Sequence, residues 1–174
     1  MMDPTRDVRR RGHHRIVEQR KGRAKGGPAK GTSFESHVIG LFPIDVFSVL
    51  HDTRRDSVAE RIPESALYPD FWLRHRPSRH SFWVECKFRS SARYGVVSWS
   101  SGVPQFERYK EFQERVRPEK VYIVVGLIGY STRPKFMYCL PLDEIAEPDL
   151  YVNEIRKYMR NPREIFTYVQ GRLY

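Results

Sequence analysis

The sequence has little of what disulfide-rich, zinc-binding or membrane-spanning proteins need. It contains two cysteines in 174 residues, and its six histidines form no His-x-x-x-His pair, so neither residue type has the spacing of a zinc site. Cys86 and Cys139 each lie in an apolar segment and are expected to be buried free thiols. Apolar runs are too short to span a bilayer, and none follows the N-terminal charges as in a secretory signal. We therefore expect an intracellular, cytoplasmic protein that is not secreted.

Negative charge and large apolar side chains are scarce in the first 30 residues. Ten Lys or Arg there face three Asp or Glu, a net of +7, whereas the whole chain carries +10, so residues 31–174 carry only +3. A segment of this kind cannot bury enough surface to fold alone. We expect a disordered basic tail over residues 1–30 and a single domain over residues 31–174.

The tail is expected to bind a polyanion, and nucleic acid is the natural one. Each Lys or Arg that docks on a phosphate releases counterions and adds affinity without reading sequence. A cluster at Arg9, Arg10 and Arg11 is the densest part of the tail. The alternative is a tail that only aids solubility, and a membrane is not expected because the tail has no apolar face.

Residues 81–88 form an aromatic and β-branched run that predicts a strand. Side chains alternate along a strand, so Glu85 and Lys87 share one face with Trp83. The opposite face is uniformly apolar and is expected in the core: Phe82, Val84, Cys86 and Phe88.

Asp70 precedes another apolar pair, Phe71 and Trp72, and a turn separates this segment from residues 81–88. An antiparallel hairpin would bring Asp70 beside Glu85. Two converging carboxylates repel each other unless a cation lies between them, and hard oxygen ligands suit Mg²⁺ or Mn²⁺. With Lys87 alongside, these are the parts that phosphoryl transfer needs. The alternative is that Glu-x-Lys is an ordinary solvated strand face.

Pro69-Asp70, fourteen further residues and then Glu85-Cys86-Lys87 resemble the motif of the PD-(D/E)xK nuclease superfamily, which has the restriction-endonuclease-like fold. The resemblance implies that Asp70, Glu85 and the main-chain carbonyl of Cys86 hold Mg²⁺ or Mn²⁺. It also implies that Lys87 orients or helps deprotonate the water that attacks phosphorus, which leaves a 5′-phosphate and a 3′-hydroxyl.

A helix is expected from residue 31, because apolar residues recur on one stripe: Phe34, Val38, Leu41 and Phe42. Glu35 lies beside this stripe. In the superfamily a first helix often offers a glutamate near the metal, so the resemblance makes Glu35 a further ligand or the holder of a second ion. The alternative is a first-turn acid favoured by the helix dipole.

A second helix is expected from Pro104 to Val116, with Gln105 and Tyr109 stacked four residues apart. This pair resembles a Gln-x-x-x-Tyr feature of one branch of the superfamily, near the active site and the nucleic acid backbone. The resemblance implies that Gln105 steadies Lys87 or the substrate. Tyr109 also belongs to the apolar stripe of the helix, so packing is its alternative role.

Residues 121–128 form a near-continuous apolar run that predicts a strand buried on both faces, reached by a right-handed parallel crossover. Further strands are expected over 44–50 and 135–140, then a short helix from 141 to 145 and a mainly helical end. The fold class is therefore α/β, with a central mixed sheet of about five strands flanked by helices, which matches the restriction-endonuclease-like fold.

The turn between the two motif strands is rich in arginine and is expected to contact the phosphate backbone, although basic residues on an exposed hairpin tip are ordinary. The expected contacts are Arg74, Arg76, Arg79, Arg89 and Arg93, with Arg54 and Arg55 extending the surface. Trp83 and Trp99 are candidates for stacking on unpaired bases, with core packing the safer assignment for at least one.

These patterns together predict a Mg²⁺-dependent phosphodiesterase, most simply a DNA endonuclease. A Holliday-junction resolvase of the same fold is one alternative, and a catalytically silent nuclease-fold protein that binds nucleic acid is another. A single-domain chain that cuts both strands of a duplex is expected to act as a homodimer.

Overall fold

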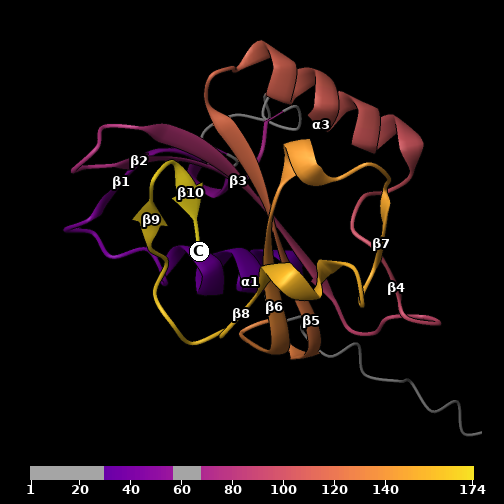
Figure 1. Cartoon of the computed structure of the whole chain (residues 1–174). Helices are drawn as coiled ribbons and strands as arrows, with labels where there is room; N and C mark the ends of the chain where they lie inside the picture. The colour runs from indigo at the N-terminus through magenta and orange to yellow at the C-terminus, as the bar shows by residue number, and fades with distance from the viewer. Residues whose placement is uncertain (1–29, 57–67) are drawn as a thin grey trace, which may run out of the picture.

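The computed structural model describes residues 30–56 and 68–174 (Figure 1). Helices and strands follow in the order α1 (Lys30–Ile39), β1 (Phe47–Asp52), α2 (Thr53–Asp56), β2 (Phe71–His75), β3 (Ser81–Arg89), β4 (Val96–Ser98), α3 (Val103–Arg115), β5 (Lys120–Tyr130), β6 (Arg133–Pro141), β7 (Asp149–Tyr151), β8 (Met159–Arg160), β9 (Tyr168–Val169) and β10 (Arg172–Leu173). Two 3₁₀ turns, η2 (Leu142–Glu144) and η3 (Ile155–Tyr158), flank β7. The expected tail, with Arg9, Arg10 and Arg11, lies outside the described residues.

The central sheet has six strands in the order β1-β2-β3-β5-β6-β8, one more than the sequence suggests. Strands β1, β2 and β3 are antiparallel neighbours, β5 runs parallel to β3, and β6 returns antiparallel to β5. Parallel neighbours need a crossover connection, and the chain makes it with α3. The α/β class and the mixed sheet are therefore confirmed.

The two longer helices cover opposite faces of the sheet (Figure 1). On the α3 face, Phe106, Tyr109 and Phe112 pack against alternate residues of β5. On the α1 face, Phe34 and Val38 pack against the other set of β5 residues and against Val84 and Cys86. The predicted alternation of β3 is confirmed, because Trp83 belongs to the α3-side core and Phe82, Val84 and Cys86 to the α1-side core.

The α1 helix sits unusually close to β5 at Gly126. A Cβ atom placed on Gly126 would lie 2.4 Å from Cε2 of Phe34, so only glycine fits beneath this ring without movement. On the other face, Gln113 ties α3 to β5: its Nε2 donates to the Glu119 carbonyl at 2.9 Å, and its Oε1 accepts from the Val121 amide at 2.8 Å.

Two local predictions are wrong. The strand expected over residues 44–50 begins only at Phe47, because the Val46 and Phe47 amides close a turn on the Pro43 carbonyl and leave Ile44 85% exposed. The mainly helical end is instead built from η3 and the short strands β7 to β10. Pro148, Pro162 and Gly171 interrupt this segment and disfavour a continuous helix.

Candidate functional site

The β2–β3 hairpin brings the two motif segments together. Phe71 pairs with Val84, so the next position outward places Asp70 opposite Glu85. The Cys86 amide donates a hydrogen bond to Oδ2 of Asp70 at 2.7 Å, which fixes the carboxylate against β3. Asp70 and Glu85, which fourteen residues separate in the sequence, are thus held together by one charge-assisted hydrogen bond and by the hairpin register.

Glu85 is almost completely enclosed, with 2% of its side chain exposed. Its Oε1 forms an ion pair with Nζ of Lys87, which is 20% exposed. Its Oε2 is buried and has no donor in hydrogen-bonding geometry among the described residues, and the Tyr109 hydroxyl is the polar group of α3 that interacts with this carboxylate. A buried carboxylate oxygen without a partner is costly, so this atom marks a place where a cation would be favoured.

The charges at this site perturb one another. Burial raises the pKa of Asp70 well above its ordinary value, and the nearby Glu85 and Glu35 carboxylates raise it further, while the Cys86 amide opposes them. Burial acts to lower the pKa of Lys87, but the Glu85 carboxylate outweighs it and leaves that pKa raised. Lys87 therefore stays charged.

Glu35 reaches the same site from α1. Burial raises the pKa of Glu35, Arg54 lowers it, and the Glu85 carboxylate raises it again. The Glu35 carboxylate interacts electrostatically with Glu85, Lys87 and Asp70, so it lies near the motif residues.

A second ion pair borders the site, and the sequence reading missed it. Arg54 binds both oxygens of Asp52, through Nε at 2.8 Å and Nη2 at 2.7 Å. Its Nη1 donates to Oγ of Ser36 at 2.9 Å, and its guanidinium lies 4.9 Å from the centre of the Phe71 ring. Arg54 was expected on a phosphate-binding surface, but here it faces Asp52, and its charge acts on Glu35. No pattern in the sequence pointed to Asp52, which is the last residue of β1.

The α3 helix contributes Tyr109 but not Gln105 to this group. Tyr109 is 5% exposed, and burial followed by the Glu85 carboxylate raises the pKa of its phenol. Tyr109 thus combines the packing role and the site position that the sequence left as alternatives. Gln105 is partly exposed, and its Oε1 accepts a hydrogen bond from the Ser101 amide at the start of α3. The contact with Lys87 implied by the resemblance is replaced by this one.

The donor set suits a hard divalent cation. Four carboxylates, from Glu35, Asp52, Asp70 and Glu85, and two cations, Lys87 and Arg54, leave a formal charge of −2. Oxygen donors of this kind prefer Mg²⁺ or Mn²⁺. Within residues 30–56 and 68–174, no three His, Cys, Asp or Glu side chains converge as a ready-made metal site. A metal would therefore rest on Asp70 and Glu85 with main-chain oxygen or water. The Cys86 thiol faces the α1-side core.

Arg89 does not serve as a free phosphate-binding cation, which corrects the sequence prediction. Its Nε donates to the Ser98 carbonyl at 2.6 Å, its Nη2 to the Trp99 carbonyl at 2.9 Å and its Nη1 to the Phe88 carbonyl at 3.1 Å. Burial lowers the pKa of Arg89. The side chain holds the segment after β3 against the strand.

The remaining predicted arginines are better placed for a polyanion. Arg76 and Arg79 are exposed on the β2–β3 turn, where Nε of Arg76 donates to the Ile44 carbonyl at 3.1 Å. Arg74 is partly buried and lies 3.4 Å from Oγ of Ser81, and Arg93 is exposed. The side chain of Arg55 lies outside the described residues.

Neither Trp83 nor Trp99 presents a ring for base stacking, because they are only 8% and 0% exposed. Trp83 stacks on Tyr68 and Trp72, at ring-centre distances of 5.9 Å and 5.3 Å, and its Nε1 donates to Glu119 at 3.0 Å. Both tryptophans are core residues. Tyr68, next to the motif, is 41% exposed and was missed.

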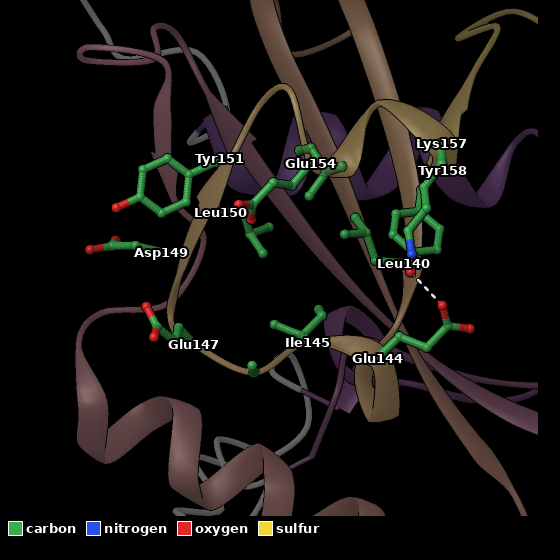
Figure 2. Close-up of a pocket in the computed structure, with 12 residues that line it drawn as sticks. Leu140, Glu144, Ile145, Glu147, Asp149, Leu150, Tyr151, Glu154, Lys157 and Tyr158 are labelled. Carbon is green, nitrogen blue, oxygen red and sulfur yellow. Dashed lines mark hydrogen bonds between the residues drawn. The ribbon is translucent and has the colours of Figure 1, made fainter.

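A pocket of about 340 Å³ lies elsewhere, between η2, β7 and η3 (Figure 2). Figure 2 shows Glu147, Asp149 and Glu154 around it, and Glu144 at its edge accepts a hydrogen bond from the Tyr158 hydroxyl. Its carboxylates disfavour a polyanion. None of its lining residues belongs to the Asp70 and Glu85 site.

Among the described elements, no helix combines the length and apolar character needed to cross a membrane. Comparison of the chain with known proteins finds no matching family model and no matching curated protein.

Proposed function

We propose that this protein is a metal-dependent nuclease that hydrolyses phosphodiester bonds, most simply a DNA endonuclease of the PD-(D/E)xK superfamily. The observation that carries the proposal is the pairing of Asp70 with Glu85-Cys86-Lys87 on adjacent strands, with a buried Glu85 oxygen that lacks a partner. The order of a helix, three antiparallel strands, a helix and a parallel strand supports the restriction-endonuclease-like assignment.

Asp70 and Glu85 would hold Mg²⁺ or Mn²⁺, with the Cys86 carbonyl as the main-chain ligand that the resemblance supplies. A divalent ion there would neutralise the non-bridging phosphate oxygens and lower the pKa of bound water. Asp70 is anchored by the Cys86 amide, and Glu85 is enclosed, so both carboxylates are fixed before substrate arrives. Glu35 would complete the site or hold a second ion.

Lys87 would orient the attacking water and stabilise negative charge on the phosphate. Its ammonium is held by Glu85, and its raised pKa keeps it charged, so it acts as an electrostatic group rather than as a neutral base. Arg76, Arg79 and Arg93 and the basic tail would supply sequence-independent affinity for the substrate backbone.

The test is cleavage of labelled single-stranded, double-stranded and four-way-junction DNA, and of RNA, in Mg²⁺, Mn²⁺ or EDTA. We expect metal-dependent cleavage that falls by about 10²-fold or more in E85Q and K87A, because each removes a group that acts on developing charge. E147Q is the matched control, since Glu147 is an exposed carboxylate away from the site.

Cleavage in EDTA, or wild-type rates in E85Q and K87A, would overturn the proposal. Binding of DNA without any metal-dependent product would support the silent binding protein instead. A strong preference for the four-way junction would select the resolvase within the same chemistry.

A further inference from the structure

The segment that follows the motif strand is held at both ends and makes a tight turn between them. Arg89 donates to the carbonyls of Ser98 and Trp99, and β4 pairs with β7, so both ends of residues 90–98 are fixed. The Arg93 and Val96 amides and carbonyls exchange hydrogen bonds of 3.1 Å and 2.9 Å, which closes a turn with only Tyr94 and Gly95 at its centre. This turn projects beside β4 at the right of Figure 1.

The turn carries a residue that its geometry disfavours. Tyr94 has φ 51° and Gly95 has φ 76°. Two-residue hairpin turns with positive φ at both positions favour Asn, Asp or Gly, and a bulky aromatic residue at such a φ is strained. Strain of this kind often marks a functional position.

The ring of Tyr94 is not packed against the rest of the described fold. It is fully exposed, with a relative accessibility of 103%, and Arg93 beside it is exposed as well. An arginine can bind a phosphate, and an exposed tyrosine ring beside it can stack on the neighbouring base. Arg93 and Tyr94 form such a pair at the end of the turn.

The turn emerges on the catalytic side of the sheet. Glu85, Lys87 and Arg89 alternate along β3 and share its α3 face. Arg89 binds the carbonyl of Trp99, and Val97 and Trp99 pack in the α3-side core. The loop therefore leaves β3 and returns over the face that carries Glu85 and Lys87, and Tyr94 is seven residues from Lys87, a span of at most about 24 Å.

We propose that Tyr94 is a base-stacking contact, which receives an unpaired nucleobase of the substrate strand while Arg93 binds the adjoining phosphate. This inference rests on the proposed function and deepens it, because it makes DNA with unstacked bases the preferred substrate. An exposed tyrosine ring can stack on any base, so the contact selects unpaired structure rather than sequence.

The test measures DNA binding by fluorescence anisotropy in EDTA, with the full chain, so that cleavage does not enter. The probes are a single-stranded oligonucleotide, the same strand with abasic sites in place of its bases, and a blunt duplex. The variants are Y94N, which suits the positive φ, Y94F, which keeps the ring, and Y174A, which removes the exposed C-terminal tyrosine beside β10 (C in Figure 1).

We expect Y94N to weaken binding of the base-containing single strand about fivefold or more, and Y94F and Y174A to bind as wild type does. The abasic strand and the duplex should be bound equally by wild type and Y94N. Y94N should also melt at the same temperature as wild type or higher, because Asn relieves the strained turn. A stability that does not fall separates lost stacking from misfolding.

Equal affinity of wild type and Y94N for the base-containing strand would overturn the inference, and so would an equal loss on the abasic strand. If the wild-type protein binds DNA and Y94N weakens only the binding of the base-containing strand, but no cleavage occurs under any condition, the proposed nuclease is refuted and the stacking contact is supported. Wild type that binds no DNA would refute both.

Discussion

Replacing Asp70 by Asn tests the electrostatic description of the site directly. In the metal-free protein, burial and the Glu85 and Glu35 carboxylates raise the pKa of Asp70. The folded state therefore binds this proton more tightly than the unfolded state, and ionisation of Asp70 costs stability as the pH rises from about 4 through the folded pKa. Asn keeps an oxygen that can accept from the Cys86 amide but removes the charge.

Two opposite effects follow. In EDTA at pH 8, D70N should unfold at the wild-type temperature or above it, and this advantage should shrink as the pH falls toward 4, because Asp70 is then protonated in the folded state and about half protonated in the unfolded state. Mg²⁺ at ten times its dissociation constant should stabilise wild type by about 1.4 kcal/mol, but not D70N. For a chain of this size, that corresponds to roughly 3–6 °C in melting temperature.

Thermal unfolding by circular dichroism, in EDTA and in Mg²⁺ across pH 4 to 8, measures both effects. E147Q controls for loss of an exposed carboxylate and should respond to Mg²⁺ as wild type does. Equal stabilisation of D70N and wild type by Mg²⁺ would show that Asp70 is not a ligand. A large fall in the melting temperature of D70N in EDTA at pH 8 would show that the hydrogen bond to Cys86 outweighs charge repulsion.

Substitutions at three further residues test the parts that support the site. In denaturant titrations, R54M should lower the free energy of unfolding by about 3 kcal/mol, because it removes the two donors that pair with the buried Asp52 carboxylate. R54K should recover only part of the lost free energy, because lysine cannot bind both carboxylate oxygens as arginine does. Q113A should cost about 2–3 kcal/mol in the same titrations, since the Val121 amide loses its acceptor. R89A should speed chymotrypsin cleavage after Tyr94, because the loop loses the two hydrogen bonds from Arg89 to the Ser98 and Trp99 carbonyls, and an unchanged cleavage rate would contradict that role.

Patterns with a clear period predicted the framework. The alternation of residues 81–88 and the apolar run at 121–128 were sufficient to predict two adjacent strands, because side-chain direction on a strand follows from position alone. The helical stripe of Phe106, Tyr109 and Phe112 likewise predicted α3. The pairing of Asp70 with Glu85 followed from the hairpin, since its register is set by which face is buried.

Contacts between polar side chains and distant backbone were not predictable in the same way. Arg89 and Gln105 looked available for nucleic acid or Lys87, yet each satisfies backbone groups at the ends of the segment from residue 90 to α3. Such partners depend on where a loop returns, which no periodicity encodes. The Asp52 and Arg54 pair was missed for the same reason, because neither residue belongs to an apolar pattern.

The close packing of Phe34 on Gly126 has a consequence for the chemistry of the site. Phe34 immediately precedes Glu35, so the depth to which this ring sinks into the sheet sets how far the glutamate reaches toward Asp70 and Glu85. A methyl group at position 126 of β5, as in an alanine, would push α1 away from the sheet. The Glu35 carboxylate would then move away from Asp70 and Glu85, although position 126 is not itself one of the site residues. The position of Glu35 relative to Asp70, Glu85 and Lys87 therefore depends on the lack of a side chain at Gly126.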